Sequence, residues 1–383
     1  MNMIQLHLRK RALASLLVLL LLLPVILACF SGCGKKYTFF LPERTLPENG
    51  ETLKYSTFRY RVYSDDTVII TEYKGDAEEL VIPDTIDGKK VVALEKNLFY
   101  QQKSLKSIRL GAYIERIGTQ CFTECSFLEK VEMGKSVWSI GAFAFAGTPW
   151  LDNLIEPPAE NTGSETAADS SSETSAETTA ETAAETTKDT SKDFLVVGDG
   201  VLLRYLGSDK NIVIPDNVHH IADAFVMSDI VSVKMSDSVY TIGEYSFAFC
   251  FSLATIDFSQ NLLSIGENAF YGCSTLPSVV FPNQLRELGA CAFYQCENLT
   301  SVRLSPSLTL LDDGAFFNCT QLRLVQIPKT LTAFGVEAFG SCPSIELVFY
   351  EGTEEEFKKI NIDSTNYIIL DATIVYNVAD QGQ

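Results

Sequence analysis

The apolar residues of the chain recur with a fixed period. Alignment on the phenylalanine of AF-type pairs gives nine copies, with successive gaps of 23, 23, 80, 22, 23, 23, 23 and 23 residues. Self-similarity at such a period is typical of a solenoid built from stacked units. The nine positions are Phe99, Phe122, Phe145, Phe225, Phe247, Phe270, Phe293, Phe316 and Phe339.

Around each phenylalanine the same apolar positions return. In most copies an Ile or Leu stands five residues earlier, as at Ile265, and further apolar residues follow at six, nine and eleven residues, as at Leu276, Val279 and Phe281. This second group alternates between inward and outward positions, is often closed by Pro, and predicts a short strand. Because one unit cannot bury its apolar side alone, the units must stack and share a core.

A cysteine stands three residues after the phenylalanine in six copies. Stacked coils would place these thiols in a column, with neighbours about 5 Å apart. No CxxC pair, histidine partner or recurring basic residue accompanies them, which disfavours a metal site and a nucleophile. We expect buried residues that donate S–H to turn carbonyls. Disulfides, Cys121–Cys125 and Cys291–Cys296 among them, are the alternative. The six are Cys125, Cys250, Cys273, Cys296, Cys319 and Cys342.

The repeated stretches carry a family resemblance. IGENAFYGCSTLPSVVFP, IGTQCFTECSFLEKVEM and LGACAFYQCENLTSVRLSP resemble the BspA-type leucine-rich repeats of bacterial surface proteins, over about Phe58 to Tyr376 apart from one insertion. The resemblance implies an α/β, strand-rich, right-handed leucine-rich-repeat solenoid with a parallel sheet on its concave face. It also implies a place on the cell surface, where some members act as adhesins that bind host or neighbouring-cell proteins.

Both ends of the repeat region are predicted to be caps, because the exposed ends of a solenoid invite aggregation. FRYRVYSDDTVIITEY alternates as a hairpin around residues 64–66. At the other end, GTEEEFKKI begins with a capping-box pattern, Thr353 with Glu356, and predicts a short helix. ATIVYN then predicts a last strand.

One segment interrupts the repeats. Residues 156–193 contain no Val, Leu, Ile or aromatic residue, and they hold ten acids and two lysines. Such a segment cannot bury a core, so we expect a solvated, extended loop, with transient helix as the alternative and O-linked sugar as a further possibility. FLVVGDGVLLRYLG follows and predicts a hairpin that turns at residues 198–200. We expect one continuous solenoid from which the acidic segment loops out.

The N-terminus carries the pattern of an export signal. A basic stretch, HLRKR, precedes an apolar run from Ala12 to Phe30. The motif that follows, Ser31-Gly32-Cys33, resembles a bacterial lipobox, and we expect lipid attachment at Cys33. Cys29 is the second candidate, and an uncleaved membrane anchor is the third interpretation. Each interpretation exports the rest of the chain.

Charge and motifs exclude several functions. The formal net charge of −19 disfavours nucleic acid and anionic membrane surfaces as partners. No GxSxG, HExxH, P-loop, GxGxxG or EF-hand pattern occurs. We expect His219 and His220, and likewise Asp312 and Asp313 before Gly314, to be solvated turn residues. A metal or pH-sensitive role for the histidines, and calcium for the acids, are the alternatives. No catalytic, metal or cofactor site is predicted.

The outward positions of the predicted strands are better candidates for function. Their charges alternate in sign along part of the row, as at Arg109 and Glu132, which is typical of a self-complementary ladder. The later copies combine apolar, cationic and aromatic side chains, which suits a protein-binding patch. We predict partner binding through Asp257, Val280, Arg303, Gln326 and Phe349.

A second stripe of aromatic residues follows three successive AF positions. These residues are Tyr271, Tyr294 and Phe317. We expect them to stack on one another, and a platform for a sugar or a partner is the alternative.

The sequence predicts six segments and a binding function. The protein is expected to be exported and membrane-anchored at the bacterial cell surface, where it binds a protein or glycan on a host or neighbouring cell without catalysis. The alternatives are a structural envelope component without a discrete ligand and an enzyme or transport accessory. The segments are a signal peptide (1–33), a tether (34–55), an N-terminal cap with the first repeats (56–154), the acidic disordered insertion (155–193), a hairpin with the remaining repeats (194–350) and a C-terminal cap (351–378).

Overall fold

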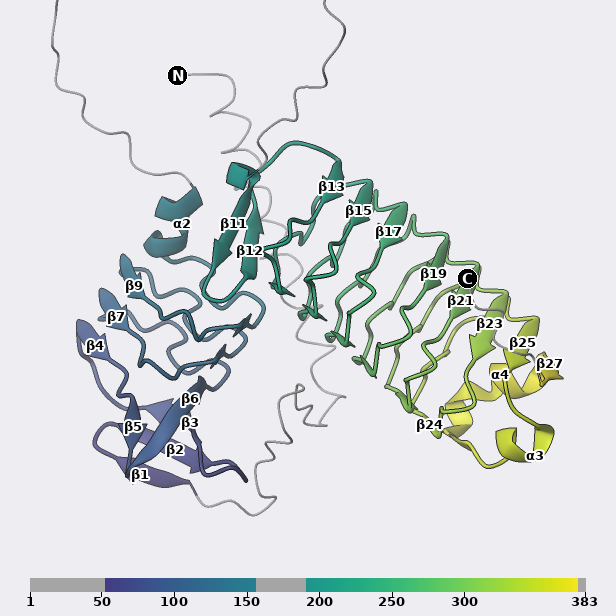
Figure 1. The fold of residues 1–383 in the computed structure, drawn as a ribbon, viewed down its shortest axis with the longest axis horizontal. Coiled ribbons are helices and arrows are strands. Elements are labelled where there is room, and N and C mark those ends of the chain that lie inside the picture. Colours follow the sequence, from purple (N-terminus) through teal and green to yellow (C-terminus); the bar gives the residue numbers. More distant parts are fainter. Residues whose placement is uncertain (1–51, 156–190, 378–383) are drawn as a thin grey trace, which may run out of the picture.

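The computed structural model describes residues 52–155 and 191–377. The signal sequence, Cys33 and most of the acidic insertion lie outside the described residues. The described residues form stacked coils arranged as an arch, with the hairpin β11–β12 at its apex (Figure 1). The coils pair through parallel strands and contain only short helices, which confirms the predicted solenoid fold.

The N-terminal cap is built from hairpins. Strand β2 pairs antiparallel with both β1 and β3, and β3 passes parallel to β6, where the coils begin. The β2–β3 connection spans the predicted turn at residues 64–66, so that prediction is confirmed. The strands of this cap are β1 (Leu53–Tyr55), β2 (Phe58–Val62), β3 (Val68–Tyr73), β5 (Thr85–Ile86) and β6 (Lys89–Leu94).

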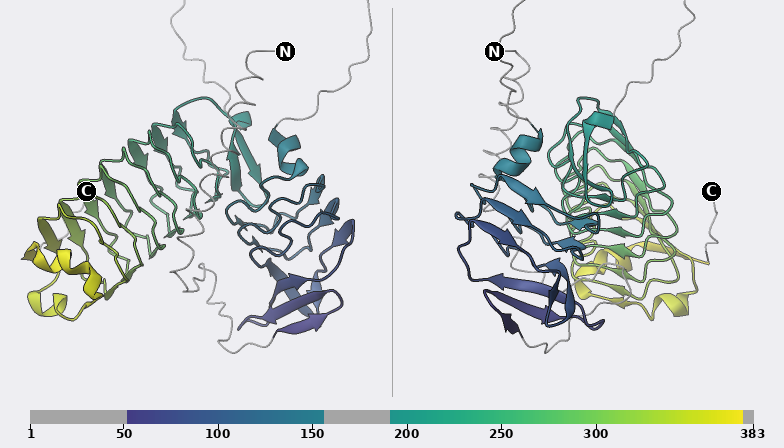
Figure 2. Two further views of the ribbon diagram at one scale, coloured as in Figure 1. Left: turned by 180° about the vertical axis from the view of Figure 1, so that it is seen from behind. Right: turned by 60° about the vertical axis from the view of Figure 1, so that its left-hand side comes forward.

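Each coil contributes one strand of three or four residues, which we call an outer strand because these strands follow the outer margin of the arch (Figures 1 and 2). Equivalent strands of neighbouring coils lie parallel and in register, as Val279, Val302 and Val325 do. The outer strands are β4 (Glu79–Val81), β7 (Ser107–Arg109), β9 (Lys130–Glu132), β13 (Asn211–Val213), β15 (Ser232–Lys234), β17 (Thr255–Asp257), β19 (Ser278–Val280), β21 (Ser301–Arg303), β23 (Leu324–Ile327), β25 (Leu347–Tyr350) and β27 (Thr373–Tyr376).

A second set of strands has two residues each and lies toward the inside of the arch; we call these the inner strands. They also pair in parallel from coil to coil, so a parallel sheet lies on the concave side as well. The inner strands are β8 (Arg116–Ile117), β10 (Ser139–Ile140), β14 (His220–Ile221), β16 (Thr241–Ile242), β18 (Ser264–Ile265), β20 (Glu287–Leu288), β22 (Leu310–Leu311), β24 (Ala333–Phe334) and β26 (Asn361–Ile362).

The outer ladder is interrupted once in the later coils, at a proline. Ala254 donates its backbone N–H to Val231 O at 2.8 Å, and Thr300 donates its own to Pro277 O at 2.8 Å. Pro277 occupies the equivalent position in the coil between them and has no N–H to donate. Strands β17 and β19 therefore belong to separate sheets of three and five strands.

The inner ladder is interrupted where an aspartate replaces glycine. Gly289 donates its N–H to Ile265 O at 2.9 Å, and a Cβ on Gly289 would lie 2.6 Å from the Glu267 nitrogen. Only glycine permits this approach of one coil to the next. Asp312 takes the same position in the following coil, and the ladder stops there, between β20 and β22.

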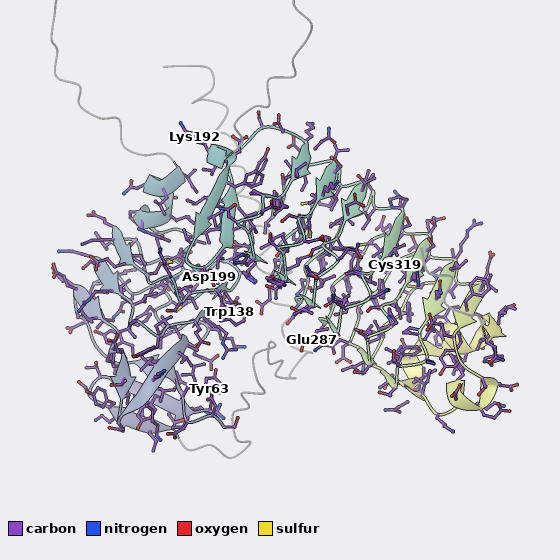
Figure 3. All side chains as sticks on the ribbon, viewed as in Figure 1. Tyr63, Trp138, Lys192, Asp199, Glu287 and Cys319 are labelled. Atoms are coloured by element: carbon purple, nitrogen blue, oxygen red, sulfur yellow. The ribbon has the colours of Figure 1, made fainter. Side chains whose placement is uncertain are left out.

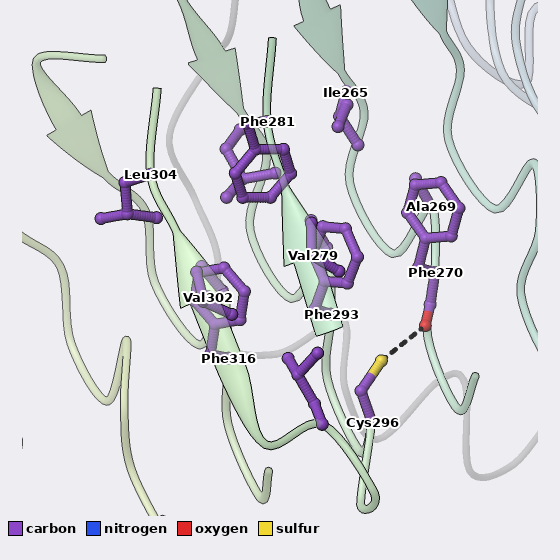
Figure 4. Close-up of a cluster of buried hydrophobic side chains, with 14 of the residues drawn as sticks. Ile265, Ala269, Phe270, Val279, Phe281, Phe293, Cys296, Val302, Leu304 and Phe316 are labelled. Atoms are coloured by element: carbon purple, nitrogen blue, oxygen red, sulfur yellow. Dashed lines mark hydrogen bonds between the residues drawn. The ribbon is translucent and has the colours of Figure 1, made fainter. Parts of the chain in front are cut away.

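The phenylalanines of the AF pairs form stacks inside the coils. Neighbouring rings lie 4.8 to 5.4 Å apart and within 15° of parallel, and the rings are fully buried. Figure 4 shows Phe270, Phe293 and Phe316 in one stack beside Val279 and Val302. The predicted repeat core is therefore confirmed.

The stack is divided at the apex of the arch. Trp150, in the helix α2 (Pro149–Ile155), contacts Phe145 with 4.5 Å between ring centroids and ends the first stack. Hairpin β11 (Phe194–Val197) and β12 (Val201–Tyr205) follows the turn η1 (Ser191–Asp193), and Tyr205 contacts Phe225, which starts the second stack. The predicted hairpin turn at residues 198–200 is confirmed.

Strand β12 lies between two apolar clusters and contributes side chains to both. Val201 and Leu203 pack into the cluster of the first coils, and Leu202 packs into the cluster of the later coils. On the inside of the bend, the Thr119 hydroxyl donates to Glu244 Oε2 at 2.5 Å. Whether the two clusters unfold as one unit stays a prediction.

The C-terminal cap closes the last coil. Thr353 and Glu356 form the predicted capping box at the start of α3 (Glu354–Phe357), so that prediction is confirmed. The turn η2 (Ser364–Asn366) and the helix α4 (Tyr367–Asp371) follow, and β27 is the predicted last strand.

Candidate binding surface

The predicted partner residues lie on five outer strands. Val280, Arg303, Gln326 and Phe349 stand opposite one another in register on β19, β21, β23 and β25, and Val375 on β27 extends the row. Asp257 lies on β17, beyond the interruption that Pro277 causes. The structure thus brings four of the five residues together in one sheet on the outer side of the arch, whereas the inner strands form the sheet on the concave side.

The same sheet face holds two apolar residues that sequence reasoning missed. Leu324 and Leu347 stand opposite each other, two positions before Gln326 and Phe349, and both are half-buried. Their alternation with the predicted row was the signal that could have found them, because residues two apart in a strand face the same side. With Phe349 and Val375 they form what we call the outer patch: Leu324, Leu347, Phe349 and Val375.

Charged residues occupy the row in the first coils. Arg109 stands opposite Glu132 in the ladder, and Lys130 on the same strand contacts the Glu132 carboxylate at 2.5 Å. Lys130, and to a lesser extent Arg109, lower the pKa of Glu132. In the following sheet Lys234 stands opposite Asp257. This part of the row is the self-complementary ladder that the sequence suggested.

The second aromatic stripe is confirmed as mutual stacking. The rings of Tyr271 and Tyr294 lie 4.9 Å apart at 4°, and those of Tyr294 and Phe317 lie 4.8 Å apart at 15°. A Cβ on Gly340 would lie 2.8 Å from the Phe317 ring, so the glycine backbone covers the last ring, and Phe249 covers the first at 5.0 Å. The ring faces within the stack are therefore covered by the neighbouring rings.

The cysteines of the repeat are buried free thiols, as predicted, and none of the described cysteines forms a disulfide. Cys296 donates its S–H to Phe270 O at 3.3 Å, and Cys273 and Cys319 make equivalent bonds (Figure 4). Figure 3 places Cys319 within the coils. Burial raises the pKa of the Cys296 thiol far above its usual range, so no reactive thiolate forms there.

The histidines differ from each other, and the prediction of two surface residues is wrong for His220. His219 is half-buried at the surface, and its Nδ1 lies 3.8 Å from Asp199 Oδ1. His220 is 2% exposed, because the coil of Ile140 packs over it at the bend. Its Nδ1 contacts the Thr241 hydroxyl at 2.5 Å, and burial lowers its pKa to about 4.

The prediction of solvated acids is wrong for Asp312. Asp312 is 4% exposed because it stands at the glycine position that faces the preceding coil, whereas Asp313 is half-buried. Burial, together with the charges of Glu244 and Asp312, raises the pKa of Glu267 to about 7. Glu287, on the inner margin in Figure 3, has a pKa of about 7 through burial alone. No group of three potential metal ligands comes together in the described part of the chain.

A shallow pocket of about 320 Å³ lies between the last coil and α4. Hydroxyl, amide and aromatic groups line it, among them Asn318, Thr320, Ser341 and Tyr367. Its lining contains no carboxylate, imidazole or amine.

No helix among the described residues has the length and apolarity that a membrane crossing requires. The predicted lipid attachment at Cys33 lies outside the described residues.

Comparison with known proteins identifies the repeat. A family model described as the BspA type leucine-rich repeat region matches six copies, over residues 78–174 and 221–346. This match spans more than half of the chain. No curated protein sequence matches significantly.

Several solved structures are similar to parts of the chain. A leucine-rich repeat protein of T. pallidum has 20% identity over 86% of this chain and 100% of its own, with a TM-score of 0.27. The pneumococcal vaccine antigen PcpA has 14% identity over 86% of this chain and 99% of its own, with a TM-score of 0.40. A leucine-rich repeat protein of Bacteroides capillosus has 32% identity over 24% of this chain and 80% of its own, with a TM-score of 0.23. Because these TM-scores lie below 0.5, the assignment to a family rests on the match to the repeat model.

Proposed function

The chain belongs to the family of proteins with BspA-type leucine-rich repeats, and from this premise we propose that it is an adhesin-like binding protein of the bacterial cell surface. It would hold a protein or glycan of a host or neighbouring cell through the outer sheet of its later coils. The function would need no catalysis and no cofactor.

One observation supports this proposal above the others. Val280, Arg303, Gln326 and Phe349 are presented in register on four consecutive strands, one residue per coil. The coils beneath them are closely stacked, so the row is held in place before any partner arrives. A preorganised row of apolar, cationic and aromatic side chains suits a protein interface, because little conformational entropy is lost on binding.

The chemistry of the described residues favours binding over catalysis. The column thiols are buried, those of Cys273, Cys296 and Cys319 stay protonated because burial raises their pKa, and His220 is buried and neutral near pH 7. A nucleophile or general base must reach its substrate, and these groups do not.

The membrane anchor is a separate part of the proposal. The basic stretch HLRKR, the apolar run and Ser31-Gly32-Cys33 support lipid attachment at Cys33. Cells labelled with a tagged fatty acid should mark the wild-type protein and not Cys33→Ala. Label retained in Cys33→Ala and lost in Cys29→Ala would move the anchor to Cys29.

A pull-down with the exported part of the chain tests the binding function. Saturable binding of a partner is expected. Arg303→Glu should weaken this binding by tenfold or more because the substitution reverses the charge at the centre of the row. Arg109→Glu, on an outer strand of the first coils, is the matched control and should leave binding unchanged, as should His219→Ala.

The alternative is a structural envelope component without a discrete ligand. The charged ladder of the first coils supports it, because that part of the row is complementary to itself. Absence of any saturable partner would favour this alternative, and equal losses in Arg303→Glu and His219→Ala would place a binding site elsewhere.

A further inference from the structure

The last outer strand leaves one edge of its sheet open. Strand β27 pairs with β25, and no other strand pairs with it within residues 52–155 and 191–377. Thr373 donates its N–H to Glu346 O at 3.0 Å, so Thr373 and Val375 direct their backbone groups toward β25. Because these directions alternate along a strand, Ile374 and Tyr376 direct theirs toward the open edge.

This edge lacks the usual protection against pairing. Natural edge strands commonly carry charged residues, above all Lys, or a Pro or a bulge. Strand β1 carries Lys54, β4 carries Glu79, and β9 carries Lys130 with Glu132, whereas β27 reads Thr-Ile-Val-Tyr; among the other edges of the described sheets, β13, for example, is also uncharged and reads Asn-Ile-Val.

The cap around the open edge is unusually apolar. Terminal caps of solenoids normally present a polar face. Here Tyr367 and Leu370 of α4 are 64% and 54% exposed, and Val375 of β27 is 38% exposed. The outer patch ends at Val375, so a strand added to β27 would lay alternate side chains beside it.

The charges around β27 indicate the kind of partner. Asp371 stands just before the strand, Glu346 lies beside its start, and Glu351 follows Tyr350, which stands opposite Tyr376 at its end. Lys358 also lies near Tyr376, but its amine pairs with Glu354 at 2.6 Å. Residues 191–377 hold 22 Asp and Glu residues and ten Lys and Arg residues. A second copy paired antiparallel through β27 would bring like charges together at both ends, whereas a strand with basic ends would neutralise them.

We propose that β27 accepts an extended strand of a partner protein, with apolar residues at alternate positions and basic residues at both ends. Backbone hydrogen bonds to Ile374 and Tyr376 would provide affinity, and contacts with the outer patch and the flanking acids would provide selectivity, as in other cases of strand addition to a sheet edge. This inference rests on the proposed binding function and names the class of partner for the same sheet.

The test uses the full-length chain and a labelled peptide with the sequence Lys-Thr-Val-Thr-Val-Lys. Fluorescence anisotropy should show saturable binding, at least tenfold tighter than for a peptide with Pro at its third position and for a peptide with Glu at both ends. Val375→Lys should weaken binding of the Lys-Thr-Val-Thr-Val-Lys peptide at least tenfold. Val213→Lys, at an exposed position of β13, the edge strand of another sheet, is the control and should bind the peptide as the wild type does.

Hydrogen exchange of the wild-type chain keeps the test independent of how the variants fold. The Ile374 and Tyr376 amides should exchange at least tenfold more slowly with the peptide bound. Equal binding of the Pro peptide, or unchanged exchange at both amides, would overturn the proposal. Protection of both amides without peptide, together with a dimer in light scattering, would overturn it in favour of a second copy.

The outcome separates this inference from the proposed function. If the peptide binds and Arg303→Glu does not affect the captured partner, β27 accepts a strand but the row of Val280, Arg303, Gln326 and Phe349 is not the binding site. A partner that depends on Arg303 while the peptide fails to bind would keep the row and reject the strand acceptor.

Discussion

Replacing Asn366 with Ala should remove the polar group that ends the ladder of AF turns. Within the coils, Phe316 donates its N–H to Ala338 O of the next coil at 2.8 Å. Within the described residues no AF turn follows that of Phe339, and Phe339 donates its N–H to Asn366 Oδ1 at 2.9 Å instead. Asn366 Nδ2 donates to Gly335 O at 2.8 Å and to Asp363 O at 3.2 Å. One side chain thus replaces the missing coil.

The expected loss follows from burial. Asn366 is 0% exposed, so truncation removes three hydrogen bonds and leaves the Phe339 N–H and the Gly335 carbonyl without those partners. Each unsatisfied buried group costs about 1–3 kcal/mol. Two such groups sum to about 2–6 kcal/mol, and because this end of the molecule can admit water we expect a loss in the lower half of that range, about 2–4 kcal/mol.

Urea unfolding followed by circular dichroism measures this loss, and hydrogen exchange at the Phe339 amide locates it. Asn283→Ala, at an exposed position, is the matched control and should change stability by less than about 0.5 kcal/mol. A loss below about 1 kcal/mol for Asn366→Ala, with unchanged exchange at Phe339, would refute the capping role.

Four further predictions follow from the packing. Gly289→Ala should cost about 1–3 kcal/mol in urea unfolding because its Cβ would meet a backbone nitrogen at 2.6 Å, whereas Gly134→Ala, with 3.9 Å to the nearest atom, should not; equal stability of the two would contradict this. Cys296→Ser should lower the free energy of unfolding by about 1–3 kcal/mol, and the thiols of the native protein should resist alkylation; stoichiometric zinc would exclude the interpretation of the cysteines as buried free thiols. The pKa of His220 falls from 6.5 to about 4 on folding, so the unfolded chain binds the proton first and this residue should lower stability by about 3 kcal/mol from pH 6.5 to 4, whereas Glu267 and Glu287, whose pKa values rise to about 7, act in the opposite direction; the difference between the wild-type and His220→Gln pH profiles isolates the decline, and profiles of equal slope would contradict it. Leu202→Ala should destabilise the whole described region in one transition, because β12 joins both clusters; two separate transitions in the wild type would show that they fold apart.

The repeat pattern was sufficient to predict the fold and the burial of its recurring positions. The stacked phenylalanines and the buried thiols, such as Phe293 and Cys296, follow from a period that returns the same side chain to the same place in every coil. Both hairpin turns and the capping box at Thr353 were also predictable, because turns and caps depend on a few neighbouring residues. The row on the outer sheet followed from alternation in the same way.

The tertiary structure decided what lies opposite each position. His220 and Asp312 stand at turn positions that the pattern marks as exposed, and both are buried: one by the coil that packs over the bend, the other by the close approach of the preceding coil. The sequence pattern showed neither the split of the outer sheet at Pro277 nor the open edge at β27, because both depend on which strands pair. The period of a sequence reports the direction in which a side chain points within its own coil. Burial also depends on the surface that meets it, and that surface comes from residues far away in the chain.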